Sequence, residues 1–509
     1  MIFKSLLLCC AFGEAASNAS ADIQISIGIS PINIIHDEYL SFNIDPSCNR
    51  GFHYTDFTNK NLRAAALYLA PARLRFGGSG ADYLTYSFTS GQPECSNIPF
   101  APPPQQPGCD YVTPGCLNST HLTSLLDLAD SATVDFIFGV AFNTTASCLG
   151  SSWDSSNADR LLTYFASTGR SVWGCELGNE VNNAGCPNSP RQQAIAVNEF
   201  RQQVLNSTTP NTRLIGPDTG YNNPMPYIAQ YLGNITPGIL TAVTHHVYLS
   251  LERKDFISSD TLSTKLDSAL PDIADFVSTV TDSESGAEIW AGEMGPIGGG
   301  DDGTCGTNST CGVFASAIWY ADDAALRATS GFTQHNRQDL WGGAYGLVNS
   351  LTSIMELGAT DPLLIKPDYY ISWLWKRTLG TGVLQAQSSS SAVRAYAFSG
   401  RPPSNFASRV YCGSAPQILL MNLASSNITV DLPTPSRVTS YAAWTLAPLG
   451  GDPFSAIATL NGSPLPTLLN VEKSNPVNFL GYITIAPILG SLTSPFQLTP
   501  YGIAFICLH

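Results

Sequence analysis

Apolar segments and segments with helical spacing alternate along the first three quarters of the chain, and this alternation limits its possible folds most strongly. We expect eight strands, at 39–45, 73–78, 134–140, 171–180, 213–218, 240–248, 287–293 and 341–348. We expect helices at 61–69, 124–129, 191–205, 264–280 and 314–329. Eight strands alternating with helices predict parallel strands closed into a (β/α)8 TIM barrel, an α/β fold. An open doubly wound sheet is the alternative, but no Gly-rich dinucleotide motif follows the first strand.

The pattern changes after about Gly380, where helical spacing becomes scarce. We expect short strands at 392–398, 417–422, 428–432, 438–446, 456–460, 482–486 and 502–507, with Gly, Pro, Ser and Asn between them. This pattern is typical of an antiparallel β-sandwich. The alternating isoleucines of 23–29 predict a further strand in the same sandwich. We therefore divide the chain into a strand at 22–36 that joins the sandwich, a barrel at 37–378 and a C-terminal sandwich at 379–509.

Charge and composition exclude several classes of function. The 509 residues carry a formal net charge of −15, and only 12% of them are charged. A nucleic-acid binder needs clustered Lys and Arg, so nucleic acid is not an expected partner. Hydrophobic residues make up 44% of the chain, which is enough for a large core. No stretch of about 20 apolar residues predicts a membrane span, and we expect a monomer.

The first 21 residues have the features of a secretory signal peptide. Lys4 precedes the apolar run 6–12, and the small residues 19–21 offer a cleavage site. Several Asn-x-Ser/Thr triplets farther along the chain favour a secreted glycoprotein. We therefore expect the protein to be extracellular.

The chain has 13 cysteines, of which Cys9 and Cys10 lie in the expected signal peptide. The remaining number is odd, so at least one cysteine has no partner in the chain. We expect this to be Cys175, which lies in an apolar strand. Two pairs are candidate disulfides: Cys305 with Cys311, and Cys412 with Cys507. Zinc-ligand spacings are missing, so we expect no metal and no other cofactor.

Two glutamates mark a candidate active site, because each ends an apolar strand. Glu180 ends the fourth expected strand and Glu293 ends the seventh. In a barrel, side chains at the C-terminal ends of strands meet at one mouth. Two carboxylates there can divide the roles of acid and nucleophile in glycoside hydrolysis, since their mutual repulsion separates their pKa values. Each glutamate alone could instead cap a helix or pair with an arginine, whereas the two together favour catalysis.

Motifs along most of the chain resemble glycoside hydrolase family 79. The segment 173–180, which reads Trp-Gly-Cys-Glu-Leu-Gly-Asn-Glu, is similar to the family's acid/base motif, and 289–293 with 298–300 to its nucleophile segment and glycine loop. Further similar segments follow in the family's order: 39–45, 74–78, 215–218, 244–248, 337–338, Tyr345, 367–370, 444–449 and 460–462. The resemblance implies a TIM barrel with an accessory sandwich.

The resemblance also implies roles for individual residues. Glu180 would be the general acid/base, Glu293 the nucleophile, and Asn179 would bind the sugar 2-hydroxyl. Tyr248 would orient Glu293. The remaining assignments concern the substrate: Gly298, Gly299, Gly300 and Tyr345 would face the sugar carboxylate, and Asp45 and Gln338 the sugar hydroxyls. A Gly-rich loop can bind an anion through exposed backbone N–H groups, although a plain turn is the alternative. For His245 and His246 we expect structural roles.

Some segments depart from the family's pattern. Ile297 stands where glucuronate-binding members often have Tyr, and 138–141 reads Phe-Gly-Val-Ala in place of Phe-Gly-Leu-Asn. Few Lys and Arg are available for a sulfated chain. We therefore expect a secreted retaining glycosidase that acts on β-linked glucuronides in polysaccharide or glycoprotein glycans. The alternatives are an endo-acting heparan sulfate hydrolase and a catalytically silent carbohydrate-binding or cell-wall protein.

Overall fold

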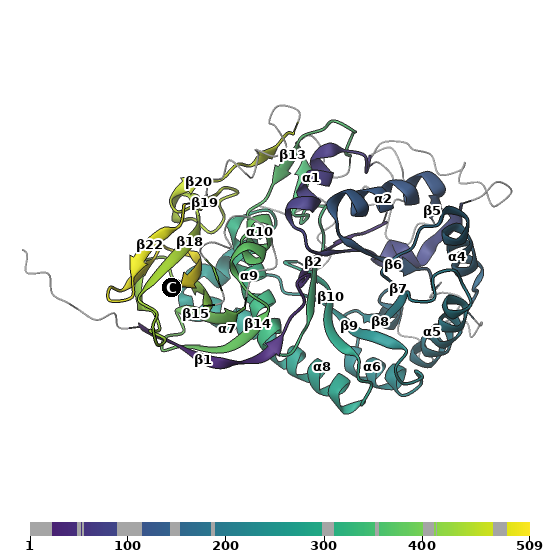
Figure 1. Ribbon diagram of the computed structural model, residues 1–509, viewed down its shortest axis with the longest axis horizontal. Coiled ribbons are helices and arrows are strands. Elements are labelled where there is room, and N and C mark those ends of the chain that lie inside the picture. Colours follow the sequence, from purple (N-terminus) through teal and green to yellow (C-terminus); the bar gives the residue numbers. More distant parts are fainter. Residues whose placement is uncertain are drawn as a thin grey trace, which may run out of the picture.

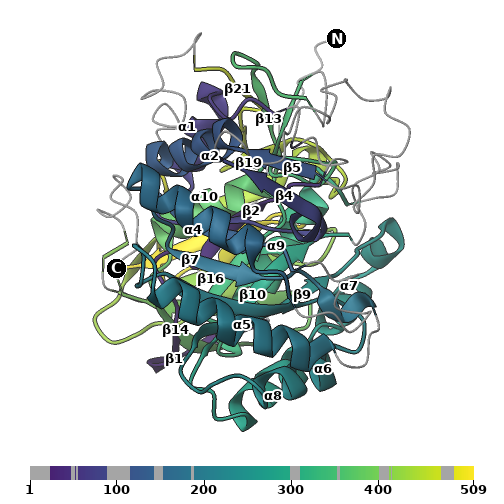
Figure 2. The same ribbon diagram turned by 90° about the vertical axis from the view of Figure 1, so that its right-hand side faces the viewer.

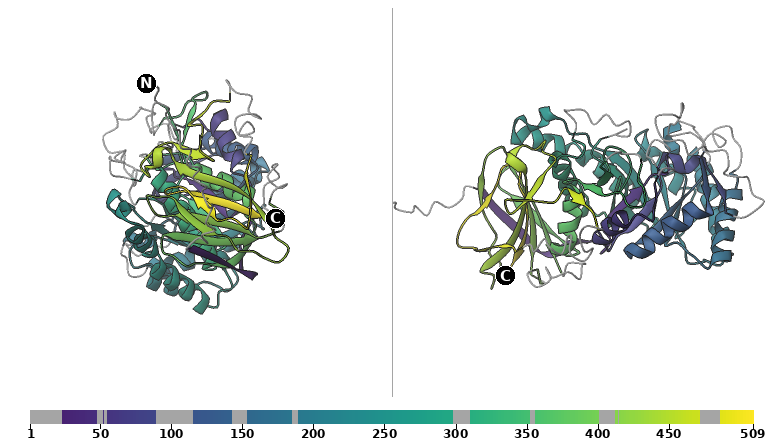
Figure 3. Two further views of the ribbon diagram at one scale, coloured as in Figure 1. Left: turned by 90° about the vertical axis from the view of Figure 1, so that its left-hand side faces the viewer. Right: turned by 90° about the horizontal axis from the view of Figure 1, so that it is seen from above.

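The computed structural model describes residues 23–47, 52, 55–88, 115–142, 153–184, 189–297, 310–351, 356–400, 412–413, 415–471 and 486–509. The expected signal peptide, the expected Cys305–Cys311 disulfide and most of the expected strand at 482–486 involve residues outside these ranges. Two lobes are visible, a barrel surrounded by helices and a layered β-domain beside it (Figures 1 and 3). None of the described helices has the length and hydropathy needed to cross a bilayer.

The first lobe is a closed barrel of eight parallel strands in the order β10-β11-β2-β3-β6-β7-β8-β9. The strands are β2 (Leu40–Ile44), β3 (Arg73–Phe76), β6 (Asp135–Val140), β7 (Gly174–Leu177), β8 (Arg213–Thr219), β9 (Leu240–Tyr248), β10 (Glu288–Gly295) and β11 (Gln334–Arg337). Their pairings are parallel throughout, which confirms the predicted TIM-barrel class over an open sheet. A small parallel pair, β4 (Leu84–Ser87) with β5 (Gly115–Asn118), lies in addition to the barrel.

Helices cover the outside of the barrel, as Figure 2 shows for α2, α4, α5, α6 and α8. The α-helices are α1 (Lys60–Tyr68), α2 (Ser119–Ala132), α4 (Ser156–Thr168), α5 (Ser189–Leu205), α6 (Pro224–Leu232), α7 (Ser259–Asp267), α8 (Leu270–Asp282), α9 (Phe314–Thr329) and α10 (Tyr369–Thr378). The single helix expected at 264–280 is wrong, because two helices occupy this region. Pro271 lies in the first turn of α8, a position that suits proline because the N–H there has no helical acceptor.

The eighth strand expected at 341–348 is also wrong, since β11 (Gln334–Arg337) closes the barrel. Its sequence, Gln-His-Asn-Arg, contains no apolar residue, yet all four side chains are buried. Polar partners compensate for that burial: His335 Nε2 lies 2.8 Å from Asp323, and Arg337 lies 2.6 Å from Asp368. A search for apolar runs cannot find such a strand, because its burial depends on partners elsewhere in the chain.

The second lobe is a mainly antiparallel β-domain that follows the barrel and contains the N-terminal strand, which pairs in parallel with β17. Its sheet runs β20-β19-β18-β24-β16-β15-β14-β1-β17-β23, and β22 pairs with β18. The strands are β1 (Ile23–Ile34), β14 (Gly382–Ser388), β15 (Val393–Ser399), β16 (Gln417–Asn422), β17 (Ile428–Asp431), β18 (Ser440–Pro448), β19 (Ala458–Leu460), β20 (Ser463–Pro464), β22 (Ile488–Ser491), β23 (Phe496–Leu498) and β24 (Ile503–Leu508). β1 pairs with β14 and β17, so segments from both ends of the sequence lie side by side (Figures 1 and 3).

Strand β24 shows how one sequence supplies two cores. Ile503 and Phe505 belong to the large core that continues into the barrel, whereas Ala504 and Ile506 belong to the separate core inside the β-domain. Because successive side chains of a strand point to opposite faces, a continuous apolar run buries both faces of the sheet. A smaller antiparallel sheet consists of β12 (Val348–Ser350), β13 (Leu363–Ile365) and β21 (Leu468–Leu469).

The cysteines that the structure describes agree with two of the predictions. Cys412 and Cys507 form a disulfide with a Cα–Cα distance of 5.1 Å. Cys175 is a free, buried cysteine, and burial raises the pKa of its thiol. The disulfide closes a long loop, so it restricts the unfolded chain considerably.

Replacing both Cys412 and Cys507 by Ser should lower the free energy of unfolding by about 2–4 kcal/mol, because the unfolded chain regains the entropy of an open loop. Urea denaturation of the oxidised protein measures the difference. A Cys175→Ala variant is the control, and a reductant should still destabilise it. Equal stability of the double variant and the unchanged protein would contradict this account.

Candidate active site

The two glutamates that the sequence singled out lie at the same end of the barrel. Glu180 follows β7, the fourth barrel strand, and Glu293 lies in β10, the seventh. The chain turns sharply after β7: Gly178 has a φ of 84°, and a Cβ there would lie 2.8 Å from the side chain of Val181. Glu180 itself has a φ of 51°, an unfavourable conformation for a residue with a side chain. Its backbone N–H donates to the carbonyl of Asp218 at 2.7 Å, which helps to hold this turn.

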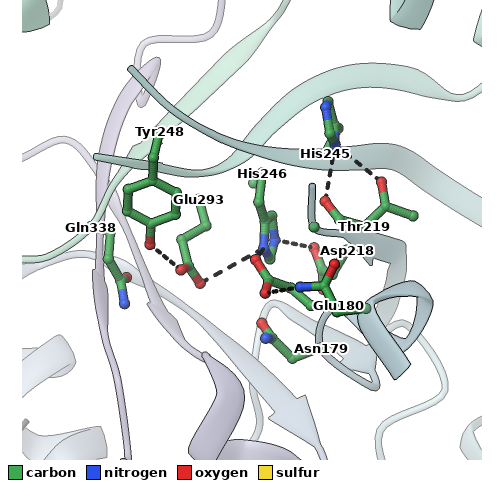
Figure 4. Close-up of polar contacts among 12 residues, drawn as sticks. Asn179, Glu180, Asp218, Thr219, His245, His246, Tyr248, Glu293 and Gln338 are labelled. Carbon is green, nitrogen blue, oxygen red and sulfur yellow. Dashed lines mark hydrogen bonds and ion pairs between the residues drawn. The ribbon is translucent and has the colours of Figure 1, made fainter. Parts of the chain in front are cut away.

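Each glutamate carboxylate accepts hydrogen bonds from two side chains. Figure 4 shows the contact between Tyr248 and Glu293. The Tyr248 hydroxyl donates to Glu293 Oε1, and Arg75 donates to Glu293 Oε2 at 3.0 Å. Around Glu180, His246 Nδ1 lies 3.1 Å from Oε1, and Asn183 donates to Oε2 at 2.7 Å. Oxygen atoms of the two glutamates lie within 4.8 Å of each other. Both carboxylates are therefore held in fixed positions and face the same small space.

The guanidinium of Arg75 connects the strands beneath this space. Arg75 lies in β3, is fully buried, and donates to Glu176 at 2.6 Å, to Asn179 at 2.9 Å and to Glu293 at 3.0 Å. It also lies 3.7 Å from Asp218. The planar guanidinium can bond several oxygens in fixed directions, which a lysine ammonium cannot do in the same way. One side chain therefore fixes the positions of polar groups on β7 and β10 and in the turn after β7.

A second cation, His246 of β9, lies between the carboxylates. Its Nδ1 faces Glu180, and its Nε2 lies 3.3 Å from Asp218 Oδ1. Although burial alone would lower the pKa of His246, the charge of Glu293 and hydrogen bonds with Asp218 and Glu180 raise it to about 10. The imidazole is therefore protonated near neutral pH, and both ring nitrogens donate.

The buried acids respond to the same network. Burial raises the pKa of Glu176 to about 8, and the neighbouring Asp218 adds to this effect. Burial alone would also raise the pKa of Asp218, but Arg75 and His246 hold it well below its ordinary value. Burial alone would lower the pKa of Arg75, but the surrounding carboxylates raise this pKa well above its ordinary value. Arg75 and His246 thus offset part of the negative charge at this end of the barrel.

The positions of Glu180, His246 and Glu293 also invite comparison with a metal site, since their potential ligand atoms lie within 4.8 Å of one another. The electrostatics do not fit a metal ion. Both ring nitrogens of His246 already face carboxylates, Nδ1 toward Glu180 and Nε2 toward Asp218, and Arg75 already supplies positive charge beside Glu293. The arrangement instead suits acid–base or nucleophilic chemistry by the two carboxylates.

Most residues predicted to bind substrate lie around the same space. Asn179 precedes Glu180; its Oδ1 accepts from Arg75, while its buried Nδ2 has no acceptor among the described residues. Gln338 donates to Asp45 at 3.2 Å, so these two side chains are connected. The rings of Tyr345 and Tyr248 lie 6.3 Å apart between centroids. Gly298, Gly299 and Gly300 lie outside the described residues.

Several residues of this site were not predicted from the sequence. Arg75, Glu176 and Asp218 had no expected role, and both histidines were expected to be structural. The structure places His246 against Glu180, whereas His245 points away and contacts Thr219 (Figure 4). His245 Nε2 also lies 3.1 Å from Asp272. The available signal was a charged residue inside an apolar strand, as in Leu-Arg-Phe of β3 and Cys-Glu-Leu of β7, because burial of a charge requires a partner.

Comparison with known proteins agrees with this arrangement. Residues 43–325 match the family described as "Glycosyl hydrolase family 79, N-terminal domain". Heparanase of Bos taurus is 28% identical over 398 residues, covering 70% of this chain and 69% of heparanase. Baicalin-beta-D-glucuronidase of Scutellaria baicalensis is 22% identical over 560 residues, covering 100% of this chain and 95% of that enzyme.

A solved structure supports the fold independently. The GH51 arabinofuranosidase from Xanthomonas axonopodis pv. citri aligns with a TM-score of 0.64 at 13% identity, over 96% of this chain and 100% of that chain. The family match covers more than half of the chain, and the barrel, the β-domain and the paired glutamates are consistent with it. The chain therefore belongs to glycosyl hydrolase family 79.

Proposed function

We propose that the chain is a retaining glycosidase that cleaves β-linked glucuronides, with Glu293 as the nucleophile and Glu180 as the general acid/base. The observation that carries this proposal is the short separation of the two carboxylates, whose oxygens lie within 4.8 Å. Retaining enzymes hold their two carboxyl groups about 5–5.5 Å apart, whereas inverting enzymes separate them by about 6.5–9.5 Å to admit a water molecule. The spacing here favours direct attack by a carboxylate.

In the first step, a Glu293 oxygen attacks the anomeric carbon, and the bond from that carbon to the leaving oxygen breaks. Glu180 gives its proton to the leaving oxygen. Tyr248 and Arg75 hold Glu293 through one hydrogen bond to each oxygen, which limits its rotation toward unproductive directions. The product of this step is a glycosyl ester of Glu293 and a free aglycone.

In the second step, Glu180 removes a proton from water, and the water oxygen displaces Glu293 from the anomeric carbon. The exposure of the two carboxylates suits this division of roles. The Glu180 side chain is 20% exposed, whereas that of Glu293 is only 7% exposed. An acid/base must exchange protons with solvent in every cycle, whereas a nucleophile benefits from exclusion of water.

Asn179 is suited to bind the sugar 2-hydroxyl. Its side chain cannot rotate freely, because Arg75 donates to its Oδ1, and this leaves the Nδ2 group as a fixed donor. Hydrogen bonds to the 2-hydroxyl strengthen in the transition state of glycoside hydrolysis and so contribute to the rate. Asp45 and Gln338, which are hydrogen-bonded to each other, are suited to the remaining hydroxyls.

The preference for a glucuronide rests on two lines of support. The relatives include a protein named as a β-D-glucuronidase, and the segment 298–300 offers three consecutive glycines. Backbone N–H groups of such a loop, together with Tyr345, are suited to a sugar carboxylate. We also propose that the protein is secreted and that its substrates are glucuronate-containing polysaccharides or glycoprotein glycans.

Heparan sulfate is the second candidate substrate, because relatives of this chain are heparanases. The charge of the chain opposes it. Binding of a sulfated polyanion needs clustered cations, and this chain has 24 Lys plus Arg against 39 Asp plus Glu. We therefore favour a less densely charged glucuronide.

Separate substitutions should distinguish the roles of the two glutamates. Glu293→Gln should lower kcat by about 10⁴-fold or more for every substrate, because no nucleophile remains. Glu180→Gln should lower kcat strongly for a 4-nitrophenyl glucuronide, whereas a 2,4-dinitrophenyl glucuronide, whose leaving group needs no proton, should still release its first equivalent rapidly. Stopped-flow measurement of phenolate release follows both steps.

Glu199→Gln is a matched control, because Glu199 lies exposed on α5, outside the site. This variant should keep the full rate. If Glu180→Gln and Glu293→Gln released dinitrophenolate from 2,4-dinitrophenyl glucuronide equally rapidly, the roles of the two glutamates would be assigned wrongly.

The specificity proposal predicts a preference among simple substrates. The kcat/KM for 4-nitrophenyl β-glucuronide should exceed the values for the β-glucoside and β-galactoside by about 10- to 100-fold. A hydrogen bond to a charged group contributes about 1.5–3 kcal/mol, and 1.36 kcal/mol corresponds to a tenfold change in rate. A higher value for the glucoside would exclude recognition of the carboxylate.

A heparin column separates the two candidate substrates. The protein should pass through at moderate salt, because its negative charge repels the sulfated matrix. A basic protein of similar size serves as the positive control. Retention at about 0.3 M salt would instead support the heparan sulfate hydrolase.

A further inference from the structure

Behind the two proposed catalytic glutamates lies a second pair of acids, Glu176 of β7 and Asp218 of β8. Glu176 is 1% exposed and Asp218 is fully buried. Counting these two with Glu180 and Glu293, four carboxyl groups surround two cations, Arg75 and His246. Full ionisation of all four would leave buried negative charge without compensation, which is unfavourable in a medium of low polarity.

The hydrogen bonds of Glu176 and Asp218 indicate that one of these two acids carries a proton. Glu176 Oε2 accepts from Arg75, and Asp218 Oδ1 faces His246. The other two oxygens, Glu176 Oε1 and Asp218 Oδ2, are buried and have no N–H donor among the described residues. Glu176 and Asp218 lie on the paired strands β7 and β8, both face the Arg75 guanidinium at 2.6 and 3.7 Å, and each carboxyl group affects the pKa of the other. Two carboxylate oxygens can form a hydrogen bond with each other only when one of them carries a proton.

The surroundings decide which acid carries the proton. Asp218 lies against both cations, at 3.7 Å from Arg75 and 3.3 Å from His246, and its backbone N–H also bonds Thr244. Among the residues that the structure describes, Glu176 contacts a single cation, Arg75, and its chain neighbour Cys175 is a buried thiol. The position with two cations favours the ionised acid, so the proton lies on Glu176. The raised pKa of Glu176 and the lowered pKa of Asp218 agree with this assignment.

We propose that Glu176 is a positioning residue that acts as a neutral carboxylic acid: it donates its proton to Asp218 and accepts a hydrogen bond from Arg75. Through these two contacts it holds the guanidinium toward Glu293 and the Asp218 carboxylate toward His246, which in turn donates to Glu180. The inference rests on the proposed roles of Glu180 and Glu293. It adds that both are held by one network whose charge depends on a single buried proton.

Two isosteric variants test the assignment of the proton. Glu176→Gln keeps the shape of a neutral acid: its amide can donate to Asp218 and its carbonyl can accept from Arg75. Asp218→Asn removes the ionised group that faces both cations. We expect kcat/KM for the glucuronide to stay within about 5-fold in Glu176→Gln and to fall by more than about 100-fold in Asp218→Asn.

Glu176→Ala shows whether the contact matters at all, and we expect a loss of more than about 100-fold in it, mainly in kcat, since it leaves Arg75 and Asp218 without their shared partner. The proposal would be overturned if Glu176→Gln did not fold, or if its kcat/KM fell as far as that of Asp218→Asn. Either result would mean that an ionised Glu176 is required. Full activity of Glu176→Ala would also overturn it. If Asp218→Asn fails to fold, this result also supports an ionised Asp218, as a loss of activity would.

Stability supplies a readout that is independent of catalysis. An unfolded glutamate ionises near its ordinary pKa of 4.5, whereas folded Glu176 keeps its proton to about pH 8. Its stabilising contribution is therefore complete below about pH 4.5 and is lost as the pH rises to about 8. Between these values the unfolding constant of the unchanged protein should rise about tenfold per pH unit relative to that of Glu176→Gln.

Parallel pH dependences of the two proteins would show that Glu176 carries no such proton. This measurement also separates the two proposals. An inactive unchanged protein would refute the glycosidase function, while the stability difference would still report on the proton of Glu176.

Discussion

The bonds of one buried arginine hold the active end of the barrel together. Arg75 rises from β3 and reaches Glu176, Asn179 and Glu293, so a single guanidinium joins β3 to groups on β7 and β10 and in the turn after β7. Burial of the Arg75 charge would be unfavourable without the Glu176 and Glu293 carboxylates, and burial of these carboxylates would be unfavourable without Arg75. Stability and proposed catalysis therefore depend on the same contacts. Removal of one partner would leave the others charged and desolvated.

The barrel supplies what this network needs. Parallel strands bring their C-terminal ends to one rim, where residues far apart in the sequence meet. His246 of β9 extends the network from Asp218 to Glu180, and the unfavourable backbone conformation of Glu180 is held by its N–H bond to Asp218. A strained residue at a functional position is stable only when its surroundings fix it. The rigid strands provide that support, and the loops beyond them are free to determine the substrate.

The sequence predicted the parts of this molecule that depend on local pattern. Strand β9 has the expected bounds, and the paired glutamates were visible because each ends an apolar strand. Strand β11 was not predictable from its own residues, since its burial depends on partners such as Asp323 and Asp368 in other elements. Arg75 and Asp218 were missed for the same reason: a charged residue in a strand indicates that some partner exists, but only the three-dimensional fold shows which one.

The central claim, direct attack by Glu293 followed by hydrolysis of the ester, is tested most directly by the configuration of the first product. Proton NMR of a reaction with 4-nitrophenyl β-glucuronide, recorded before the released sugar equilibrates, distinguishes its two anomers. Two displacements at the same carbon predict that β-glucuronic acid forms first. Initial formation of the α-anomer would mean that water attacks the substrate directly, and it would contradict the mechanism derived from the short separation of Glu180 and Glu293.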